Sequence, residues 1–338
     1  MRALLPSLGR FYSSAAVQEG SRRIAHPALQ RSKNNVVLFK SFADRVRQEL
    51  LHQATQPRLH LQSLPRISRI LGGLRTHELT IFSGPTGCGK TTVLSQMSLD
   101  WASQGVPVLW GSFEVRNPRL AQTMLQQIVR SPLFQDSDEK SFDEGLWQEA
   151  SRRLGQLPLQ FMDLHGSCNL ETVLEAMEAT IQSIVASAKE ERGGGEEKPL
   201  LIILDNLQFM LSGQGNSALD RWEVMDRAIS AVRSFCSYWP VHLMLVVHPR
   251  KEADDTLLGI SSVAGTAKAT QEADNVIILQ KIQDDRYLEV KKNRFHGELG
   301  RVPIGFLPEE RLIAEIRKEK RPIHKEEDRE EQETSLTD

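Results

Sequence analysis

The chain has 338 residues, of which 40% are hydrophobic and 25% are charged, the profile of an ordinary globular protein. Its net charge of −2 does not by itself indicate a nucleic-acid-binding protein, and its cysteines contain no CxxC pair, which argues against a zinc ribbon or a disulfide framework. Residues 319–338 carry a net charge of −4, which leaves +2 for the rest, so an acidic tail masks a slightly basic body. No apolar run is long enough for a transmembrane helix, and we expect no membrane insertion.

The first residues combine apolar, serine and arginine side chains with few acids. Arginines occur from Arg2 onward, and the first acidic residue is Glu19. This composition is typical of an amphipathic mitochondrial transit peptide, which we predict over residues 1–33. A basic N-terminus without a targeting role is the alternative interpretation. At the other end, residues 317–338 are predicted to be a charged, disordered tail.

A helix is predicted over residues 41–54, where apolar residues recur at helical spacing and Ser41 is a candidate N-cap. We assign it to a linker segment, residues 34–62. The next apolar stretch, 64–74, leads into the main domain. It packs either on its own core or on a neighbouring subunit.

From residue 77 the pattern alternates between apolar strands and amphipathic helices. The predicted strands are 78–84, 106–115, 157–163, 200–206 and 241–248, followed by a hairpin at 275–281 and 286–295. The predicted helices are 91–105, 117–130, 170–189 and 226–239. Residues 189–198 are glycine-rich and charged, and they are predicted to form a surface loop. The alternation predicts an α/β fold over residues 63–316, with a mainly parallel twisted sheet, helices on both faces and a C-terminal β-hairpin.

The stretch GPTGCGKT matches the P-loop pattern GxxxxGK[ST] at every required position. It follows a predicted strand and opens a predicted helix, so backbone amides and the positive helix end face the phosphates of a nucleotide. Lys90 is expected to reach the β- and γ-phosphates, and Thr91 to coordinate Mg²⁺. Cys88 contributes its backbone amide, with a redox role as the minor alternative. The predicted ATP-binding residues of this stretch are Gly84, Pro85, Thr86, Gly87, Cys88, Gly89, Lys90, Thr91 and Thr92.

Two acidic residues follow predicted strands. Asp205 ends LLIILD and is a candidate second Mg²⁺ ligand. Glu114 comes after the strand next to the P-loop helix. Because the carboxyl ends of parallel strands gather at one edge, Glu114 can face the γ-phosphate and activate water.

Several separate stretches then occur in order between residues 60 and 312: GPTGCGKTT, WGSFEVRNPRLA, IILDNLQFM, VVHPRK, GTAKATQEADNVIILQ and VKKNRFHGELG. Together they resemble the hexameric RecA-like replicative helicases of the DnaB class, and most closely their Twinkle-like mitochondrial branch. The resemblance implies a RecA-like P-loop core with ATP and Mg²⁺ as cofactors. It also implies a hexameric ring that acts on single-stranded DNA.

The resemblance also implies roles for single residues. Glu114 is the expected catalytic glutamate, and His248 is the expected sensor that links the γ-phosphate to the DNA-binding loops. Arg294 is the expected arginine finger for the adjacent subunit, assisted by Lys292. Phe306 is expected against the nucleotide base, with a place in the hydrophobic core as the alternative.

DNA-binding loops are implied after two strands. Arg250 and Lys251 follow His248, and Thr266 and Lys268 lie in the small-residue stretch SSVAGTAKAT. Small residues let the backbone approach a DNA strand, while amides and lysines hold phosphates.

The predicted function is therefore ATP-dependent 5′–3′ unwinding of DNA in mitochondrial DNA replication. The expected location is the nucleoid of the mitochondrial matrix, with mitochondrial replication proteins as possible partners. The chain lacks the primase-like region that Twinkle-like relatives carry, so no primase activity is expected. Two alternatives stay open: a RecA-type recombination or repair ATPase, and a regulatory subunit that binds ATP and DNA without unwinding.

Overall fold

A computed structural model describes residues 37–55, 58–135, 141–192, 199–214, 218–249, 256–263 and 267–316. The predicted transit peptide and the predicted C-terminal tail lie outside these residues. The chain divides into two compact units, Met1–Gln56 and Pro57–Asp338.

The described part of the first unit contains a short 3₁₀ helix, η1 (Phe39–Ser41), and the helix α3 (Ala43–Thr55). The predicted helix over 41–54 is thus present, but the predicted capping by Ser41 is wrong. The Ser41 hydroxyl donates to the carbonyl of Leu38 at 2.7 Å, inside the 3₁₀ turn, because the chain tightens before the α-helix begins.

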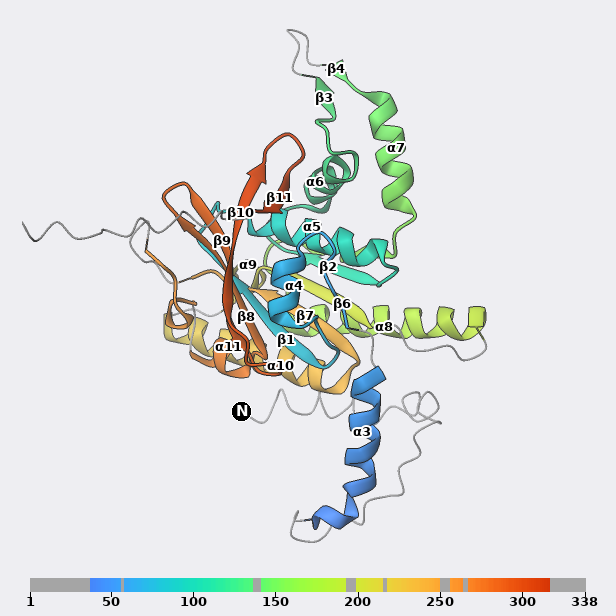
Figure 1. The fold of residues 1–338 in the computed structure, drawn as a ribbon, viewed down its shortest axis with the longest axis vertical. Coiled ribbons are helices and arrows are strands. Elements are labelled where there is room, and N and C mark those ends of the chain that lie inside the picture. The colour runs from blue at the N-terminus through green and yellow to red at the C-terminus, as the bar shows by residue number, and fades with distance from the viewer. Residues whose placement is uncertain are drawn as a thin grey trace, which may run out of the picture. The chain divides into compact units, whose positions relative to one another are not determined.

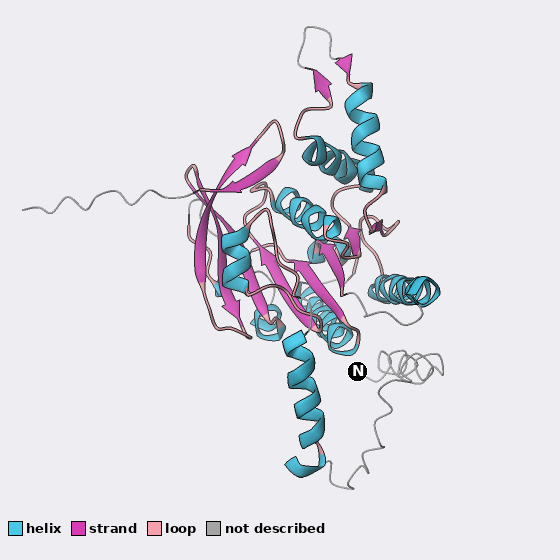
Figure 2. Cartoon of the chain, turned by 45° about the vertical axis from the view of Figure 1, so that its right-hand side comes forward, coloured by secondary structure: helices cyan, strands magenta, loops and turns pink. Residues whose placement is uncertain are grey.

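The second unit is built on a nine-stranded sheet in the order β11-β10-β9-β8-β1-β7-β6-β2-β5 (Figures 1 and 2). Six of its strands are parallel: β1 (Glu78–Ser83), β2 (Val108–Ser112), β5 (Leu159–Phe161), β6 (Leu200–Asp205), β7 (Val241–Val246) and β8 (Asn275–Ile282). Three more extend the sheet in antiparallel pairing: β9 (Asp285–Asn293), β10 (Gly300–Leu307) and β11 (Leu312–Glu315). The predicted hairpin is β8–β9, and two further strands continue it.

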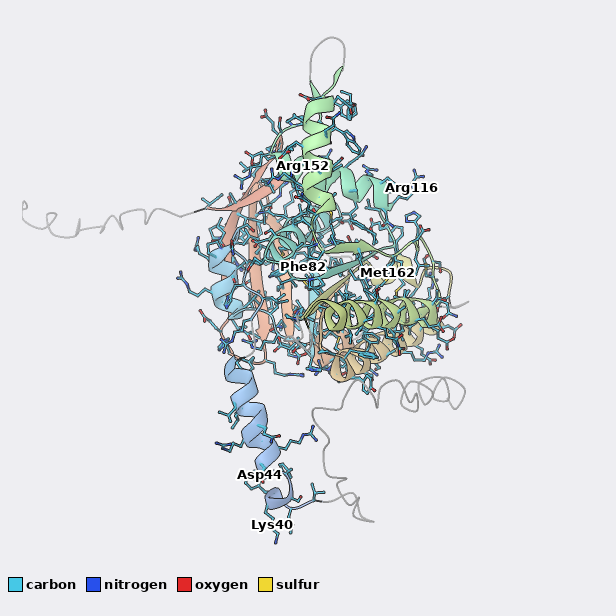
Figure 3. All side chains as sticks on the ribbon, turned by 90° about the vertical axis from the view of Figure 1, so that its right-hand side faces the viewer. Lys40, Asp44, Phe82, Arg116, Arg152 and Met162 are labelled. Carbon is cyan, nitrogen blue, oxygen red and sulfur yellow. The ribbon has the colours of Figure 1, made fainter. Side chains whose placement is uncertain are left out.

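Helices cover both faces of this sheet, as predicted (Figure 2). One face packs against α4 (Pro65–Leu71), α5 (Lys90–Ser103) and α6 (Asn117–Val129). The other packs against α8 (Leu170–Arg192), α9 (Leu207–Met210), α10 (Ala218–Tyr238) and α11 (Ala267–Glu272). Successive strand residues serve opposite faces: Ile81 belongs to the second core and Phe82, at the centre of Figure 3, to the first.

Several local elements differ from the sequence prediction. A small hairpin, β3 (Phe134–Gln135) with β4 (Ser141–Phe142), and the helix α7 (Glu144–Gly155) were not expected and lie beyond α6, away from the sheet (Figure 1). Asp143 caps α7 by accepting from the amide of Leu146 at 2.9 Å. The loop predicted at 189–198 starts later, because α8 continues to Arg192, and α10 begins before the predicted residue 226.

Candidate nucleotide-hydrolysis site

The loop between β1 and α5 has the backbone that phosphate binding requires. Gly84 has φ +154°, and a Cβ there would lie 2.6 Å from the carbonyl of Leu279. Gly89, the residue before α5, has φ +101°, a conformation that favours glycine. The ammonium of Lys90 lies over this loop and donates to the carbonyls of Gly84 and Pro85 at 2.9 Å each. A buried cation and the N-terminus of a 14-residue helix therefore face the same small volume.

The two predicted Mg²⁺ ligands are in direct contact. The Thr91 hydroxyl donates to Oδ2 of Asp205 at 2.6 Å, which brings the second residue of α5 to the end of β6. Asp205 is only 2% exposed, and burial raises its pKa to about 6, with the nearby Glu114 charge acting in the same direction. A hydroxyl and a carboxylate oxygen are hard donors that fit Mg²⁺. Among the described residues no cluster of three His, Cys, Asp or Glu side chains could hold a metal ion.

Glu114, Asn206 and His248 form a polar chain beside this pair, at the ends of three neighbouring strands. Asn206 follows β6 directly, while Glu114 and His248 each lie two residues beyond the ends of β2 and β7. The Asn206 amide nitrogen contacts Oε2 of Glu114 and lies 2.8 Å from Nε2 of His248. His248 Nε2 is 3.4 Å from the same Glu114 oxygen. Glu114 and His248, two of the predicted catalytic residues, thus both contact an asparagine to which the sequence prediction gave no role.

The Asn206 side chain has little freedom to turn. Its Oδ1 accepts from the amide of Phe209 at 3.0 Å and so caps α9, which directs Nδ2 toward the other two groups. Nε2 of His248 therefore lies within reach of both the donating Asn206 amide nitrogen and the accepting Glu114 carboxylate. Burial, and next the charge of Lys90, lower the pKa of His248, while Glu114 opposes the shift.

Gln208 attaches this arrangement to the strand that leads to the predicted DNA loop. Its Oε1 accepts from the amide of His248 at 3.1 Å, and its Nε2 donates to the carbonyl of the same residue at 3.4 Å. Arg250 and Lys251, two predicted DNA-binding residues, come directly after this point but lie outside the described residues. Thr266 lies outside them as well. Lys268 is described and lies on α11, half-buried.

Phe306 lies beside the P-loop, as predicted for a residue that contacts the base. It lines a cavity of about 210 Å³ together with Gly87, Gly89 and Thr92. Arg286, which the sequence prediction missed, enters the same cavity with its guanidinium 5.8 Å from the Phe306 ring centre. An aromatic ring and a guanidinium plane next to a phosphate loop suit a purine base. The signal for Arg286 is only its position at the start of β9, and nothing in the local sequence marks it.

Arg294 and Lys292 lie at the opposite edge of the sheet. They occur at the end of β9, which is antiparallel to β8, so they lie beside the beginnings of the parallel strands. The six residues of β1 separate this edge from the P-loop by about 20 Å at 3.3 Å per residue. The Lys292 ammonium donates to the carbonyls of Thr270 and Gln271 at 2.7 and 3.2 Å, so in its own chain it is bound to the end of α11. The structure therefore joins Lys90, Thr91, Asp205, Glu114 and His248 and does not join Arg294 or Lys292 to them.

A protein-family model described as an AAA domain matches residues 46–254, more than half of the chain. The chain therefore belongs to the AAA domain family. Two solved structures share its fold with a TM-score of 0.67 each. One is an ATPase domain, 13% identical, for which the match covers 83% of this chain and 100% of the other. The second is a DnaB-like replicative helicase studied with primase, 12% identical, covering 83% of this chain and 67% of the other.

The fold is thus the RecA-like ATPase fold found in DnaB-like replicative helicases. No helix in the described part of the chain is long and apolar enough to cross a membrane.

Proposed function

We propose that this chain is an ATP-dependent DNA helicase of the DnaB class that moves 5′ to 3′ along single-stranded DNA. The observation that carries the proposal is the chain of contacts from Glu114 through Asn206 to His248, at the phosphate end of the P-loop. It provides a carboxylate for water and an imidazole for a phosphate oxygen. Two of the predicted DNA-binding residues, Arg250 and Lys251, follow His248 closely in the sequence.

The residues divide the chemistry among them. Lys90 and the amides of the P-loop hold the phosphates, and Phe306 with Arg286 holds the base. Bound Mg²⁺, held by Thr91 and Asp205, would neutralise phosphate charge. Glu114 is placed to orient a water molecule and accept its proton.

His248 connects that event to DNA. Its imidazole contacts Asn206 and its backbone contacts Gln208, so a shift of the imidazole toward a γ-phosphate oxygen would move the segment that follows. Repeated around a ring, small loop movements would carry a strand of DNA through the centre. Few basic side chains per subunit suffice because the ring repeats them, which fits a chain with a net charge of −2.

The test is hydrolysis and unwinding by the purified protein. We expect ATPase activity that single-stranded DNA stimulates, and separation of a forked duplex that needs a 5′ tail on the loading strand. Lys90→Ala should abolish both, while an arginine outside the site, Arg152→Ala, should leave both intact. Hydrolysis without strand separation would favour the regulatory alternative. Filaments on DNA in place of rings would favour the recombinase alternative.

We also propose that the protein belongs to the Twinkle-like branch and works in the mitochondrial matrix. The support is the composition of residues 1–33 and the order of the helicase stretches. Import into isolated mitochondria with removal of an N-terminal segment is the expected result. A chain lacking residues 1–33 should stay outside, and equal import of both chains would contradict the assignment.

A further inference from the structure

Asp274 directly precedes β8 and accepts hydrogen bonds from three parts of the chain: β1, α10 and the residue after β9. It is 6% exposed. Its Oδ1 accepts from Arg294 at 2.9 Å, and its Oδ2 accepts from the amide of Leu79 at 2.9 Å and from Arg233 of α10. One buried carboxylate therefore serves two guanidinium groups and the beginning of the central strand.

The backbone of Asp274 strengthens the same junction. Its amide donates to the carbonyl of Leu79 at 2.8 Å, and its carbonyl accepts from the amide of Arg294 at 2.9 Å. Asp274 is thus fixed to β1 by both backbone and side chain. It holds Arg294 by both as well.

Arg294 is held on one side and open on the other. Its second amino group donates to the carbonyl of Gln271 at 3.0 Å, at the end of α11, yet 50% of its side chain is exposed. An exposed arginine normally explores many rotamers and loses this conformational freedom when it is fixed. Here a buried anion and a helix-end carbonyl restrict that freedom before any neighbour arrives.

We propose that Asp274 is a positioning residue that directs Arg294 toward the nucleotide of the adjacent subunit. The proposal rests on the proposed function, in which Arg294 acts between subunits. A pre-oriented guanidinium stabilises developing phosphoryl charge better than one that must be ordered during the reaction. Asp274 does not touch the reacting atoms. It acts through Arg294.

Mixed oligomers provide a test that separates this role from a structural one. Glu114→Gln subunits keep the finger and lose the water-activating group, and Arg294→Ala subunits keep the site and lose the finger. Mixing the two should restore ATP hydrolysis. Asp274→Asn is then added to one kind of subunit at a time.

On the finger-donating Glu114→Gln subunit, Asp274→Asn should lower the restored turnover at least about tenfold without changing KM for ATP. On the Arg294→Ala subunit it should have no effect, because that subunit contributes only its site. The matched control is Glu289→Gln on the finger donor. Glu289 is another buried carboxylate of the same hairpin, bound to Lys291 at 3.0 Å and Arg301 at 3.1 Å, and the substitution should leave the restored turnover unchanged.

Equal losses in both arms, or no loss in either, would overturn the proposal. Asp274→Glu, which keeps the charge but moves it by one methylene, is the second variant if Asp274→Asn does not assemble. Failure of both variants to assemble would assign Asp274 to the fold alone and overturn the proposal too. If Glu114→Gln and Arg294→Ala subunits show no rescue before Asp274 is changed, the shared site itself is wrong.

Discussion

The central sheet has one edge where its parallel strands end, here called the first edge, and one where they begin, the second edge. Polar groups are arranged differently at these two edges. At the carboxyl edge, groups from three strands and the P-loop bond to one another inside a single chain: Thr91 to Asp205, and Glu114 to His248 through Asn206. At the opposite edge, Arg294 is bound on one side and half-exposed on the other. The first edge is internally connected, and the second offers a charge outward. In the proposed function, Arg294 at the second edge acts on the nucleotide of another subunit.

Removing the outward-facing charge should have the largest effect. We expect Arg294→Ala to lower kcat at least about a thousandfold, in the range found for arginine fingers, and to leave nucleotide affinity unchanged. Arg301→Ala is the matched control, since Arg301 is a nearby arginine that binds Glu289 at 3.1 Å. Steady-state ATPase rates and fluorescent-nucleotide binding measure the two quantities. Parallel losses of affinity and kcat would remove the distinction between the edges.

Low pH should reduce the stability of the fold by protonating His242, which lies near the start of β7, at the second edge. Its ring contacts Thr80 at 2.9 Å and the carbonyl of Arg75 at 2.7 Å, and burial lowers its pKa to about 4. A lowered pKa means that the neutral ring stabilises the fold fully above pH 6.5, and that this stability is lost as the pH falls toward 4. The loss should approach roughly 3 kcal/mol for a shift of this size.

Urea unfolding at half-unit pH steps checks this prediction. The His242→Gln variant should be less stable at pH 7 and should show a shallower decline between pH 6.5 and 4. His60→Gln, a change of an exposed histidine, should keep the wild-type slope. A wild-type slope in His242→Gln would contradict the assignment.

The internal connection of the first edge depends on Asn206. Asn206→Asp keeps the oxygen that caps α9 but loses both donors to Glu114 and His248, and it adds a charge beside Glu114. We expect kcat to fall about ten- to a hundredfold, as for loss of an orienting group, with a small change in KM. Gln208→Ala should lower kcat less, because the Gln208 side chain bonds to the backbone of His248 and not to its ring. Wild-type turnover in Asn206→Asp would show that the chain of contacts has no catalytic part.

The smallest effect should be on binding of the base. Phe306→Ala removes a ring from the cavity beside the P-loop and should raise KM about tenfold at unchanged kcat, the size expected for one stacking contact. Phe295→Ala is the matched control, because Phe295 is a similarly exposed ring at the other edge, stacked by Arg75 at 3.7 Å. Equal increases in KM for Phe306→Ala and Phe295→Ala would contradict the assignment of Phe306 to the base site.

The sequence predicted the first edge better than the second for a physical reason. Parallel strands bring the residues that follow them to one edge, so Asp205 and Glu114 could be grouped from their positions, while His248 came from the family resemblance. Asp274 and Arg286 could not, because their partners lie across β-strand pairings whose register the sequence does not display. Asn206 was visible next to Asp205, but its part depends on the cap that turns its amide toward Glu114.

The predictions of some local elements were wrong or missing for a related reason. The Ser41 hydroxyl could cap the following helix or bond to the carbonyl of Leu38, and in the 3₁₀ turn it bonds to the carbonyl. The helix α7 and the strands β3 and β4 are short, and the apolar residues that hold α7 to α6 are few. The long alternation of apolar strands and amphipathic helices was read correctly because burial on two faces imposes it.

In the proposed function Arg294 completes the nucleotide site of a neighbouring copy, and this restricts how copies can associate. The P-loop and Arg294 lie at opposite ends of β1, about 20 Å apart. A two-fold dimer would complete both sites only if both ends lay in one self-complementary surface, whereas a head-to-tail contact completes one site at each interface. Any open row of such subunits leaves one nucleotide without a finger at its end. Only closure of the row into a ring completes every site, and a single subunit that fails to join leaves its neighbour idle.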